Sequence, residues 1–399
     1  MASLTRIVRD VGLAEELAQD ALVAALERWP QSGVPDNPGA WLMATAKLRA
    51  IDLFRRSKTL KRKHEDFARE LDTLQAMPER DLAAAIDDDV GDDLLRLVFI
   101  ACHPVLSTEA RVALTLRLLG GLTTEEIARA FLVPASTVAQ RIVRAKRTLS
   151  EARVPFEVPH GAERDARVSS VLEVIYLIFN EGYSATAGDD WTRPALCEDA
   201  LRLGRVLAEL TPAEPEVHGL VALLEIQASR LRARTGANGE PILLLDQNRA
   251  RWDHLLIRRG LAALDRAQRL GGALGPYALQ AAIAACHARA RTPEETDWRR
   301  IVALYDALAQ LVPSPIVELN RAVAISMAFG PAAGLDIIDG LASEPSLRAY
   351  HLFPSVRGDL LAKLERFDEA RAEFERAASL TQNARERELL LARAAGVTK

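Results

Sequence analysis

Residues 122–149 read LTTEEIARAFLVPASTVAQRIVRAKRTL, and this stretch decides the fold of the chain around it. Thr123 or Thr124 can cap a helix whose first turn carries Glu125 and Glu126, the sign of charge that a helix N-terminus favours. A short turn at 132–134 leads into a second helix, and proline is tolerated at the start of a helix. The stretch therefore predicts a helix-turn-helix.

The second helix of this stretch has two distinct faces. Its apolar stripe has helical spacing and consists of Val138, Ile142, Ala145 and Leu149. The opposite face and its flanks carry hydrogen-bonding and basic side chains: Ser136, Thr137, Gln140, Arg141, Arg144 and Arg147. Such a helix can present polar groups to base edges in the major groove while its arginines contact phosphates. A helical hairpin with an ordinary solvated face is the alternative, and Leu132 stands where many helix-turn-helix motifs have glycine.

Charge is distributed unevenly around this motif. Residues 1–64 carry a net charge of +4, residues 65–93 a net charge of −9, and residues 94–153 a net charge of +5. Two basic blocks therefore flank an acidic connector. Basic blocks attract phosphate backbones, which makes nucleic acid a reasonable partner, although solvated charge on helices is the alternative.

The first basic block predicts two helices. The stretch from Ala14 to Trp29 has a helical apolar stripe and is expected to end at Pro30, before a loop rich in proline and glycine. A second helix is expected over about 40–57, and basic residues surround its apolar stripe. The connector at 58–91 shows no obvious core.

After Pro155 the chain reads as a series of amphipathic helices separated by glycine and proline. Their expected starts are near Asp165, Arg193, Glu214, Arg249, Pro276, Thr296, Pro315, Ala332, Ser346, Phe367 and Ala384. A pattern typical of tetratricopeptide helix pairs of about 34 residues occurs twice, 36 residues apart. Its positions are Ala322, Gly334, Ile338 and Leu341, then Gly358, Ala370, Phe374 and Ala377, with Gln382 where the unit usually has proline. The predicted fold class is all-α.

Several classes of function fit the chain poorly. No apolar run is long enough to cross a membrane, and no signal peptide is visible at the N-terminus. The three cysteines, Cys102, Cys197 and Cys286, are far apart, which suits a reducing cytoplasm. Cys102 and Cys286 each precede a histidine directly, and adjacent residues lack metal-ligand spacing. No nucleotide loop or nucleophile elbow is present. We therefore expect no enzyme, no cofactor and no metal.

Three groups of motifs resemble one family. The stretch 122–146 is similar to region four of the extracytoplasmic-function sigma factors of bacterial RNA polymerase, and 14–29 and 38–56 resemble region two. The stretches 174–185 and 320–324 look like the subgroup with a tetratricopeptide-like C-terminal extension. The resemblance implies four parts: region two at 1–64, shortened at its N-terminus or begun at an internal start; an acidic linker at 65–92; region four at 93–153; and a helical repeat domain at 160–399.

The resemblance also implies partners and roles. Core RNA polymerase would contact the helix carrying Leu17, Gln19 and Asp20. Promoter DNA would meet region four at its −35 element, through the six polar and basic residues given above. The −10 element would be held through Asn37, Trp41, Lys47, Arg49, Arg55 and Arg56. The alternative for Trp41 is that it is an aromatic residue of the core. The alternative for Arg55 and Arg56 is that they lie at a solvated helix end.

The C-terminal part has no assigned role in this resemblance. Helical repeats form concave surfaces that suit a protein partner or an intramolecular one, so we expect regulation of promoter binding in cis. The motif from Phe179 to Tyr183 is expected to form a buried hydrogen-bond cluster rather than a ligand site. A one-component transcription regulator with a helical sensor domain is the alternative for the whole chain, although it leaves the first basic block unexplained.

Overall fold

The structure is a computed structural model, and it describes residues 2–8, 10–56, 93–131, 133–159, 161–271 and 273–397. Most of the predicted acidic connector lies outside these residues. The chain forms two compact units: one comprises residues Met1–Arg129 and Val133–Val174, and the other Ala130–Leu132 and Ile175–Lys399. In the described part nearly all regular structure is helical, which confirms the predicted fold class.

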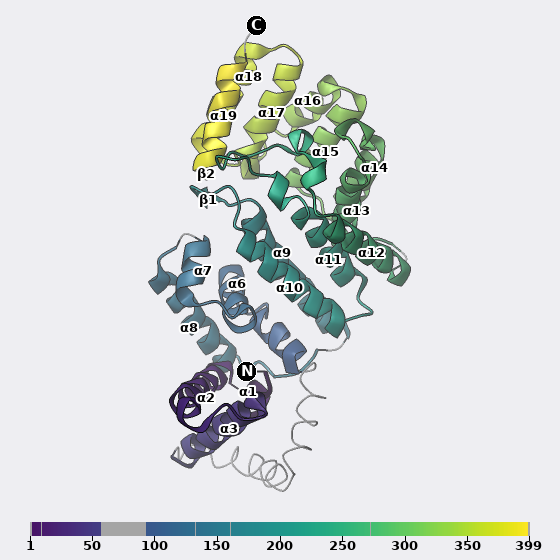
Figure 1. Ribbon diagram of the computed structural model, residues 1–399. Coiled ribbons are helices and arrows are strands. Elements are labelled where there is room, and N and C mark those ends of the chain that lie inside the picture. The colour runs from purple at the N-terminus through teal and green to yellow at the C-terminus, as the bar shows by residue number, and fades with distance from the viewer. Residues whose placement is uncertain are drawn as a thin grey trace. The chain divides into compact units, whose positions relative to one another are not determined.

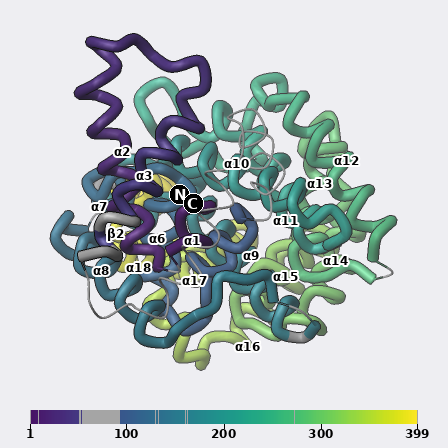
Figure 2. Tube along the Cα trace, turned by 90° about the horizontal axis from the view of Figure 1, so that it is seen from below, coloured from purple at the N-terminus to yellow at the C-terminus, as the bar shows by residue number. Residues whose placement is uncertain are grey.

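The N-terminal part of the first unit consists of α1 (Ala2–Val8), α2 (Val11–Ser32) and α3 (Pro38–Arg56). Figures 1 and 2 show α2 and α3 side by side. The core between the three helices contains Leu4, Leu17, Ala46 and Ala50, each at most 2% exposed. Four of the six buried hydrophobic residues of α2, namely Ala14, Ala21, Ala24 and Ala25, are small, so the neighbouring helices can approach closely.

Helix α2 differs from the prediction at its end. We expected it to stop at Pro30, but it continues to Ser32 with the proline inside its last turn. A proline inside a helix removes one backbone hydrogen bond and crowds the carbonyl oxygen of residue i−4. Here only two residues follow it, so the disturbance is confined to the last turn. The N–H of Gly33 then closes the helix on the carbonyl oxygen of Trp29, with Gly33 at a φ of 81° that favours glycine.

The rest of the first unit is a second group of helices. A helix over 93–101 is followed by α6 (Thr108–Thr115), a π-helical turn at Leu116–Gly120, α7 (Thr124–Phe131), α8 (Ala135–Glu151) and the first half of α9 (Gly161–Tyr183). Arg111 of α6 joins α9 to this group, because its guanidinium donates to Ser170 Oγ at 2.5 Å and to Glu173 at 3.0 Å. The beginning of α9, which we expected to open the repeat domain, is thus packed in the first unit.

The second unit is a train of helices. They are α10 (Pro194–Leu210), α11 (Pro215–Ala228), α12 (His254–Leu270), α13 (Pro276–Arg289), α14 (Trp298–Leu311), α15 (Pro315–Phe329), α16 (Pro331–Gly340), α17 (Leu352–Lys363), α18 (Phe367–Leu380) and α19 (Ala384–Gly396). Short turns of 3-10 helix lie at Leu231–Ala233, Leu244–Asp246, Arg249–Arg251, Pro293–Glu295 and Pro345–Leu347. From α11 to α19 consecutive helices pack on one another, and Figure 2 shows these helices following a curve.

The predicted repeat corresponds to two helix pairs, α15 with α16 and α17 with α18. A Cβ atom on Gly334 would lie 2.8 Å from the carbonyl oxygen of Ala322, and one on Gly358 would lie 3.0 Å from the ring of Phe374. The small residues of the pattern are therefore the points at which the two helices of each pair approach most closely. Gln382, which replaces the usual proline, belongs to the two-residue strand β2 (Gln382–Asn383), which pairs in parallel with β1 (Ala187–Gly188).

The motif Phe179–Tyr183 forms the hydrogen-bond cluster that we expected. Glu181 is 8% exposed, accepts a hydrogen bond from Thr186 Oγ1 at 2.9 Å and forms an ion pair with Arg193. The guanidinium of Arg234 stacks 3.7 Å above the centre of the Tyr183 ring. These contacts fix the end of α9 and the chain that follows it, up to the start of α10.

Candidate nucleic-acid interface

The helix-turn-helix is present, and two reciprocal hydrogen bonds cap the start of its first helix. Thr123 Oγ1 accepts from the N–H of Glu126 at 3.2 Å, and Glu126 Oε2 accepts from the N–H of Thr123 at 2.8 Å. This reciprocal capping box fixes the start of α7. Gly121, just before it, has a φ of 75°, which lets the chain turn sharply out of the preceding helix.

Helix α8 presents one face to the interior and one to solvent. All four residues of the predicted apolar stripe, Val138, Ile142, Ala145 and Leu149, are at most 6% exposed. Ile127 and Ala128 of α7 are buried with them, so the small Ala128 lies where the two helices meet. Because the inner face is fully used for packing, the rotation of α8 about its axis is determined.

The six residues predicted to contact the −35 element lie on the solvent side of α8. Ser136, Gln140, Arg144 and Arg147 are exposed, whereas Thr137 and Arg141 are half-buried. Arg147 forms an exposed ion pair with Glu151 at 3.0 Å. Arg144 has no ion-pair partner among the described residues, so its charge is available to a phosphate group.

Around α3 the structure gives two of the predicted −10 residues a local role. The side-chain oxygen of Asn37 accepts from the N–H of Ala40 at 3.0 Å and so caps the start of α3. The half-buried Trp41 packs edge-to-face against Trp29, with ring centres 5.5 Å apart. Asn37 and Trp41 thus hold the loop between α2 and α3 in place, and their outer edges remain at the surface.

The basic residues of α3 are only partly described. Arg49 is paired with Asp20 of α2 at 3.0 Å, and both side chains are more than one-third exposed. Lys47 is half-buried. The side chains of Arg55 and Arg56 lie outside the described residues, although the backbone of α3 extends to Arg56.

The predicted polymerase-binding residues on α2 divide into two kinds. Leu17 is 0% exposed and belongs to the core of the three N-terminal helices, so it must be removed from the set of direct contacts. Its helical position put it on the inner face, because α1 and α3 pack there. Gln19 and Asp20 are exposed.

Sequence reasoning missed an apolar patch on the same helix. Leu22, Val23 and Leu26 of α2 are 52%, 50% and 76% exposed. Their spacing of one and four residues puts Leu22 and Leu26 on one side of the helix. The sequence could have indicated this patch, because Leu22, Val23 and Leu26 are apolar but lie outside the helical stripe that packs in the core. Exposed apolar groups next to Gln19 and Asp20 form a surface suited to a protein partner.

Within the first unit, α2 is joined to the helix-turn-helix by a buried carboxylate. Glu15 is 9% exposed and pairs with Arg117 at 2.9 Å and with Lys146 of α8. Asp10, which caps α2 through the N–H of Leu13, also accepts from Ser150 Oγ at 3.2 Å. We define Glu15, Arg117 and Lys146 as the Glu15 cluster.

The three cysteines of the chain lie in the packed interior of the described structure. All three cysteines are buried, and burial raises the pKa of Cys102 and of Cys197 to about 12. Such thiols stay protonated and pack as small apolar groups. Among the described residues, no three side chains of the metal-binding types come together. No described helix has the length and apolar character needed to cross a membrane.

Comparisons with known proteins agree with this arrangement. The family Sigma-70 region 2 matches residues 1–59, the family Sigma-70 region 4 matches residues 96–149, and a family of unknown function, DUF6596, matches residues 167–268. An uncharacterized protein of Rhizobium meliloti (strain 1021) is 45% identical over 388 residues, which cover 97% of this chain and 90% of that protein.

Two further relatives are named as sigma factors. The "Probable ECF RNA polymerase sigma factor SigI" of Mycobacterium tuberculosis is 29% identical over 159 residues, which cover 40% of this chain and 53% of that protein. The "ECF RNA polymerase sigma factor SigK" of Mycobacterium ulcerans is 29% identical over 153 residues, 37% of this chain and 75% of that protein. No solved structure matches the chain.

Proposed function

The chain belongs to the extracytoplasmic-function family of RNA polymerase sigma factors, and from this premise we propose that it reads the −35 element of a promoter with the outer face of α8 and the −10 element with the surface around α3. Sigma factors give a polymerase its sequence specificity and carry no chemistry of their own. We further propose that this protein acts in the cytoplasm, where it recruits core polymerase.

The observation that carries the proposal is the separation of the two faces of α8. All four residues of its apolar stripe are buried, whereas Gln140 and Arg144 on the other side are exposed to solvent in the described structure. Amide and guanidinium groups can pair with adenine and guanine edges in the major groove. An exposed polar face that has no structural role in the fold is what base readout requires.

Polymerase binding is supported by α2. Leu22, Val23 and Leu26 form an apolar surface at the centre of the helix, and Gln19 and Asp20 lie beside it. Exposed apolar centres with polar surroundings are typical of protein interfaces. We therefore assign the contact with core polymerase to these five residues.

For the second unit we propose regulation of promoter binding in cis. The support is its size and its covalent continuity with the first unit through α9, whose first half is part of the fold of the first unit. A chain of residues 1–174 keeps that half of α9, and its helicity can be checked by circular dichroism. A clear change in its promoter-specific transcription, relative to the full chain, would support regulation in cis, and unchanged transcription would remove it.

The test of the main proposal is reconstituted transcription with core polymerase against a library of promoters. We expect run-off transcripts from a subset that share a −35 and a −10 sequence. A chain that binds DNA but never co-purifies with core polymerase would instead be a one-component regulator. If the chain binds no DNA at any salt concentration, the assignment of α8 is wrong.

A further inference from the structure

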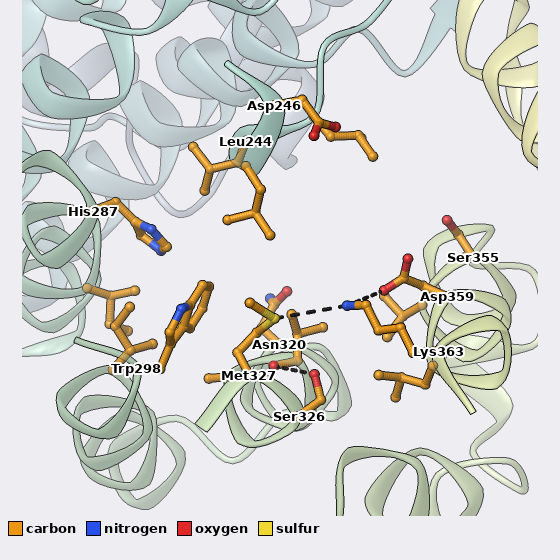
Figure 3. A pocket seen from close by; sticks show the side chains of 18 of the residues that line it. Leu244, Asp246, His287, Trp298, Asn320, Ser326, Met327, Ser355, Asp359 and Lys363 are labelled. Carbon is orange, nitrogen blue, oxygen red and sulfur yellow. Dashed lines mark hydrogen bonds and ion pairs between the residues drawn. The ribbon is translucent and has the colours of Figure 1, made fainter. Parts of the chain in front are cut away.

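A large cavity lies within the second unit and is used by nothing described so far. Its volume is about 850 Å³, and α13 to α15, α17 and α19 line it together with the segment Pro241–Asp246. This volume falls within the range of roughly 300–1,000 Å³ that is typical of small-molecule sites. Figure 3 shows the cavity with the labelled side chains directed into it from several elements.

The chain's own segment Pro241–Asp246 forms one wall of the cavity. The N–H of Ile242 donates to the carbonyl oxygen of Arg234 at 2.7 Å, and the buried Gln247 donates to the carbonyl oxygen of Ile242 at 3.1 Å. Curved helical repeats often bind an extended peptide along their inner face. Here a fixed stretch of the same chain lies against that face, so the remaining space is bounded and suits a small ligand better than a long peptide.

One side of the cavity is apolar and aromatic. Trp298, Ile301 and Tyr305 of α14 line it, and Leu243 and Leu245 are 40% and 36% exposed in the opposite segment. An apolar ligand that covers these leucine side chains removes apolar surface from water, which favours binding. This part of the cavity would hold the apolar portion of a ligand.

The other side carries cations that share a single carboxylate. Asp359 of α17 pairs with Lys363 at 2.9 Å and with Arg393 of α19. Figure 3 shows the Lys363 ammonium directed toward Met327, whose Sδ atom lies 4.0 Å from Lys363 Nζ. The three charged groups leave one positive charge in excess, and the Lys363 ammonium has a further hydrogen available to an anion.

A buried histidine adds a second point of recognition. His287 is 7% exposed, lines the cavity, and its Nδ1 atom has no hydrogen-bond partner in the described part of the chain. Burial and the nearby Arg230 and Arg249 lower its pKa to about 3. Neither arginine has a carboxylate within ion-pair distance in the described residues; the exposed Glu294 and Glu295 act on Arg249 only from further away.

The charges around the cavity therefore favour an anion. The cluster of Asp359, Lys363 and Arg393 has one positive charge in excess, and the other carboxylate of the lining, Asp246, is exposed to solvent. The two arginines behind His287 add positive potential. The geometry points to a binding site for a small amphipathic organic anion, with its charged group at Lys363 and Arg393 and its apolar body on Trp298 and Tyr305. This inference goes beyond the proposed function and does not depend on it, because binding can be measured without polymerase or DNA.

The test uses two dyes that share the same aromatic body. Anilinonaphthalene sulfonate carries the anionic group, and N-phenylnaphthylamine lacks it. Both are titrated by fluorescence into the full chain. We expect the sulfonate to bind at least about tenfold more tightly than the neutral dye, as one charge-assisted hydrogen bond to a partly desolvated cation would give.

Three variants locate the site. Lys363→Met should weaken binding of the sulfonate about tenfold and leave the neutral dye unchanged. Asn320→Trp, at an exposed position on the cavity wall, should weaken binding of both dyes by narrowing the space. Arg366→Gln is the matched control, because Arg366 pairs with Glu369 outside the cavity and its loss should change neither affinity.

Two results would overturn the inference. Equal affinity of the wild-type chain for both dyes would show an apolar cavity without selectivity for anions. Sulfonate affinity that is unchanged in Lys363→Met or in Asn320→Trp, with wild-type circular dichroism spectra, would place the bound dye elsewhere on the chain.

Discussion

At the scale of single residues, Gln140 and Arg141 are neighbours on α8 with different surroundings. Gln140 is exposed, whereas Arg141 is half-buried and lies near the charge of Glu109. An arginine held on one side by protein is more ordered, and less conformational entropy is then lost when it binds DNA. Both residues project from the part of α8 that enters the major groove in the proposed complex.

We expect Gln140→Ala and Arg141→Ala each to weaken binding to the −35 element by about 1–3 kcal/mol, if each contacts a base. Binding is measured by footprinting of the holoenzyme on a responsive promoter, together with the base preference at each position. Arg366→Ala, in the second unit, is the control and should have no effect. Unchanged affinity and preference in both α8 variants would contradict the assignment.

Asn383 is a second residue whose role is local and testable. Its side chain is 0% exposed, caps α19 through the N–H of Glu386 at 3.1 Å, and donates to the carbonyl oxygens of Ala185 at 3.1 Å and Asp190 at 2.8 Å. One amide thus joins the start of α19 to the loop after α9, which are nearly 200 residues apart in the chain.

We expect Asn383→Ala to destabilise the second unit by about 2–4 kcal/mol, because two buried groups and one partly buried carbonyl lose their hydrogen-bond partner. The measurement is urea unfolding, with hydrogen exchange at 185–190 as a local probe. Asn320→Ala is the control, since that exposed asparagine has no hydrogen bond recorded in the described structure. Equal losses in both variants would contradict a specific role for Asn383.

At the scale of elements, the contact between α2 and α8 depends on the Glu15 cluster. The carboxylate accepts from two cations, and the three side chains are between 11% and 25% exposed. Lys146 belongs to the same helix as the proposed base-reading residues. The cluster therefore couples the packing of the polymerase-binding helix to that of the DNA-binding helix.

We expect Glu15→Gln to weaken this packing by about 1–3 kcal/mol, less than for a fully buried ion pair because solvent screens the partly exposed cations. The readout is hydrogen exchange in α2 and α8. Asp20→Asn, which breaks only the exposed pair with Arg49, should change exchange little. Equal exchange in the wild type and Glu15→Gln would show that apolar packing alone holds the two helices together.

The apolar patch on α2 is the other feature at this scale. Leu26 is 76% exposed and has no role in the core. We expect Leu26→Asp to reduce affinity for core polymerase about tenfold or more, because the new carboxylate would be buried in the complex. Stability should be nearly unchanged, because this position is exposed in the free chain. Co-purification and titration with core polymerase measure the effect.

Leu391→Asp, at a residue that is 50% exposed on α19, is the matched control for this patch. Loss of affinity in both variants would show a general effect of added negative charge. Wild-type affinity of Leu26→Asp would move the polymerase contact away from α2.

At the scale of the whole molecule, the stability of the second unit should depend on pH through His287. Its pKa is lowered from 6.5 to about 3, first by burial and then by Arg230 and Arg249. Between these two pH values His287 is protonated in the unfolded chain and neutral in the folded chain. The stabilising contribution is complete above pH 6.5 and is lost as the pH falls toward about 3.

We expect the free energy of unfolding of the second unit to fall by about 2 kcal/mol more in the wild type than in His287→Gln between pH 7 and pH 5. Urea titrations at the two pH values measure this difference. His103, whose pKa is lowered to about 4, acts in the same pH window but in the first unit, so probes must be placed in the second. Parallel pH profiles of both proteins would contradict the role of His287.

Much of this organisation could be predicted from local patterns. The cap at Thr123, the turn before α8 and the apolar stripe from Val138 to Leu149 are interactions between residues close in sequence, and the structure has them where we expected them. Helix starts at proline were also predictable, since proline acts on its own backbone. The starts of α9, α12 and α17, expected near Asp165, Arg249 and Ser346, lie at Gly161, His254 and Leu352 instead. Short 3-10 turns precede α12 and α17, and our prediction included these turns in the two helices.

Long-range contacts decided the rest. The sequence by itself determined an all-helical chain, a helix-turn-helix with a basic outer face and repeated helix pairs, because periodicity and caps act within a few residues. Only the tertiary structure decided that Leu17 is in the core while Leu26 is exposed, that Glu15 meets Lys146, and that a bounded cavity with His287 and Lys363 on its walls lies among the repeats. These features join side chains distant in sequence, and the packing of whole helices brings them together.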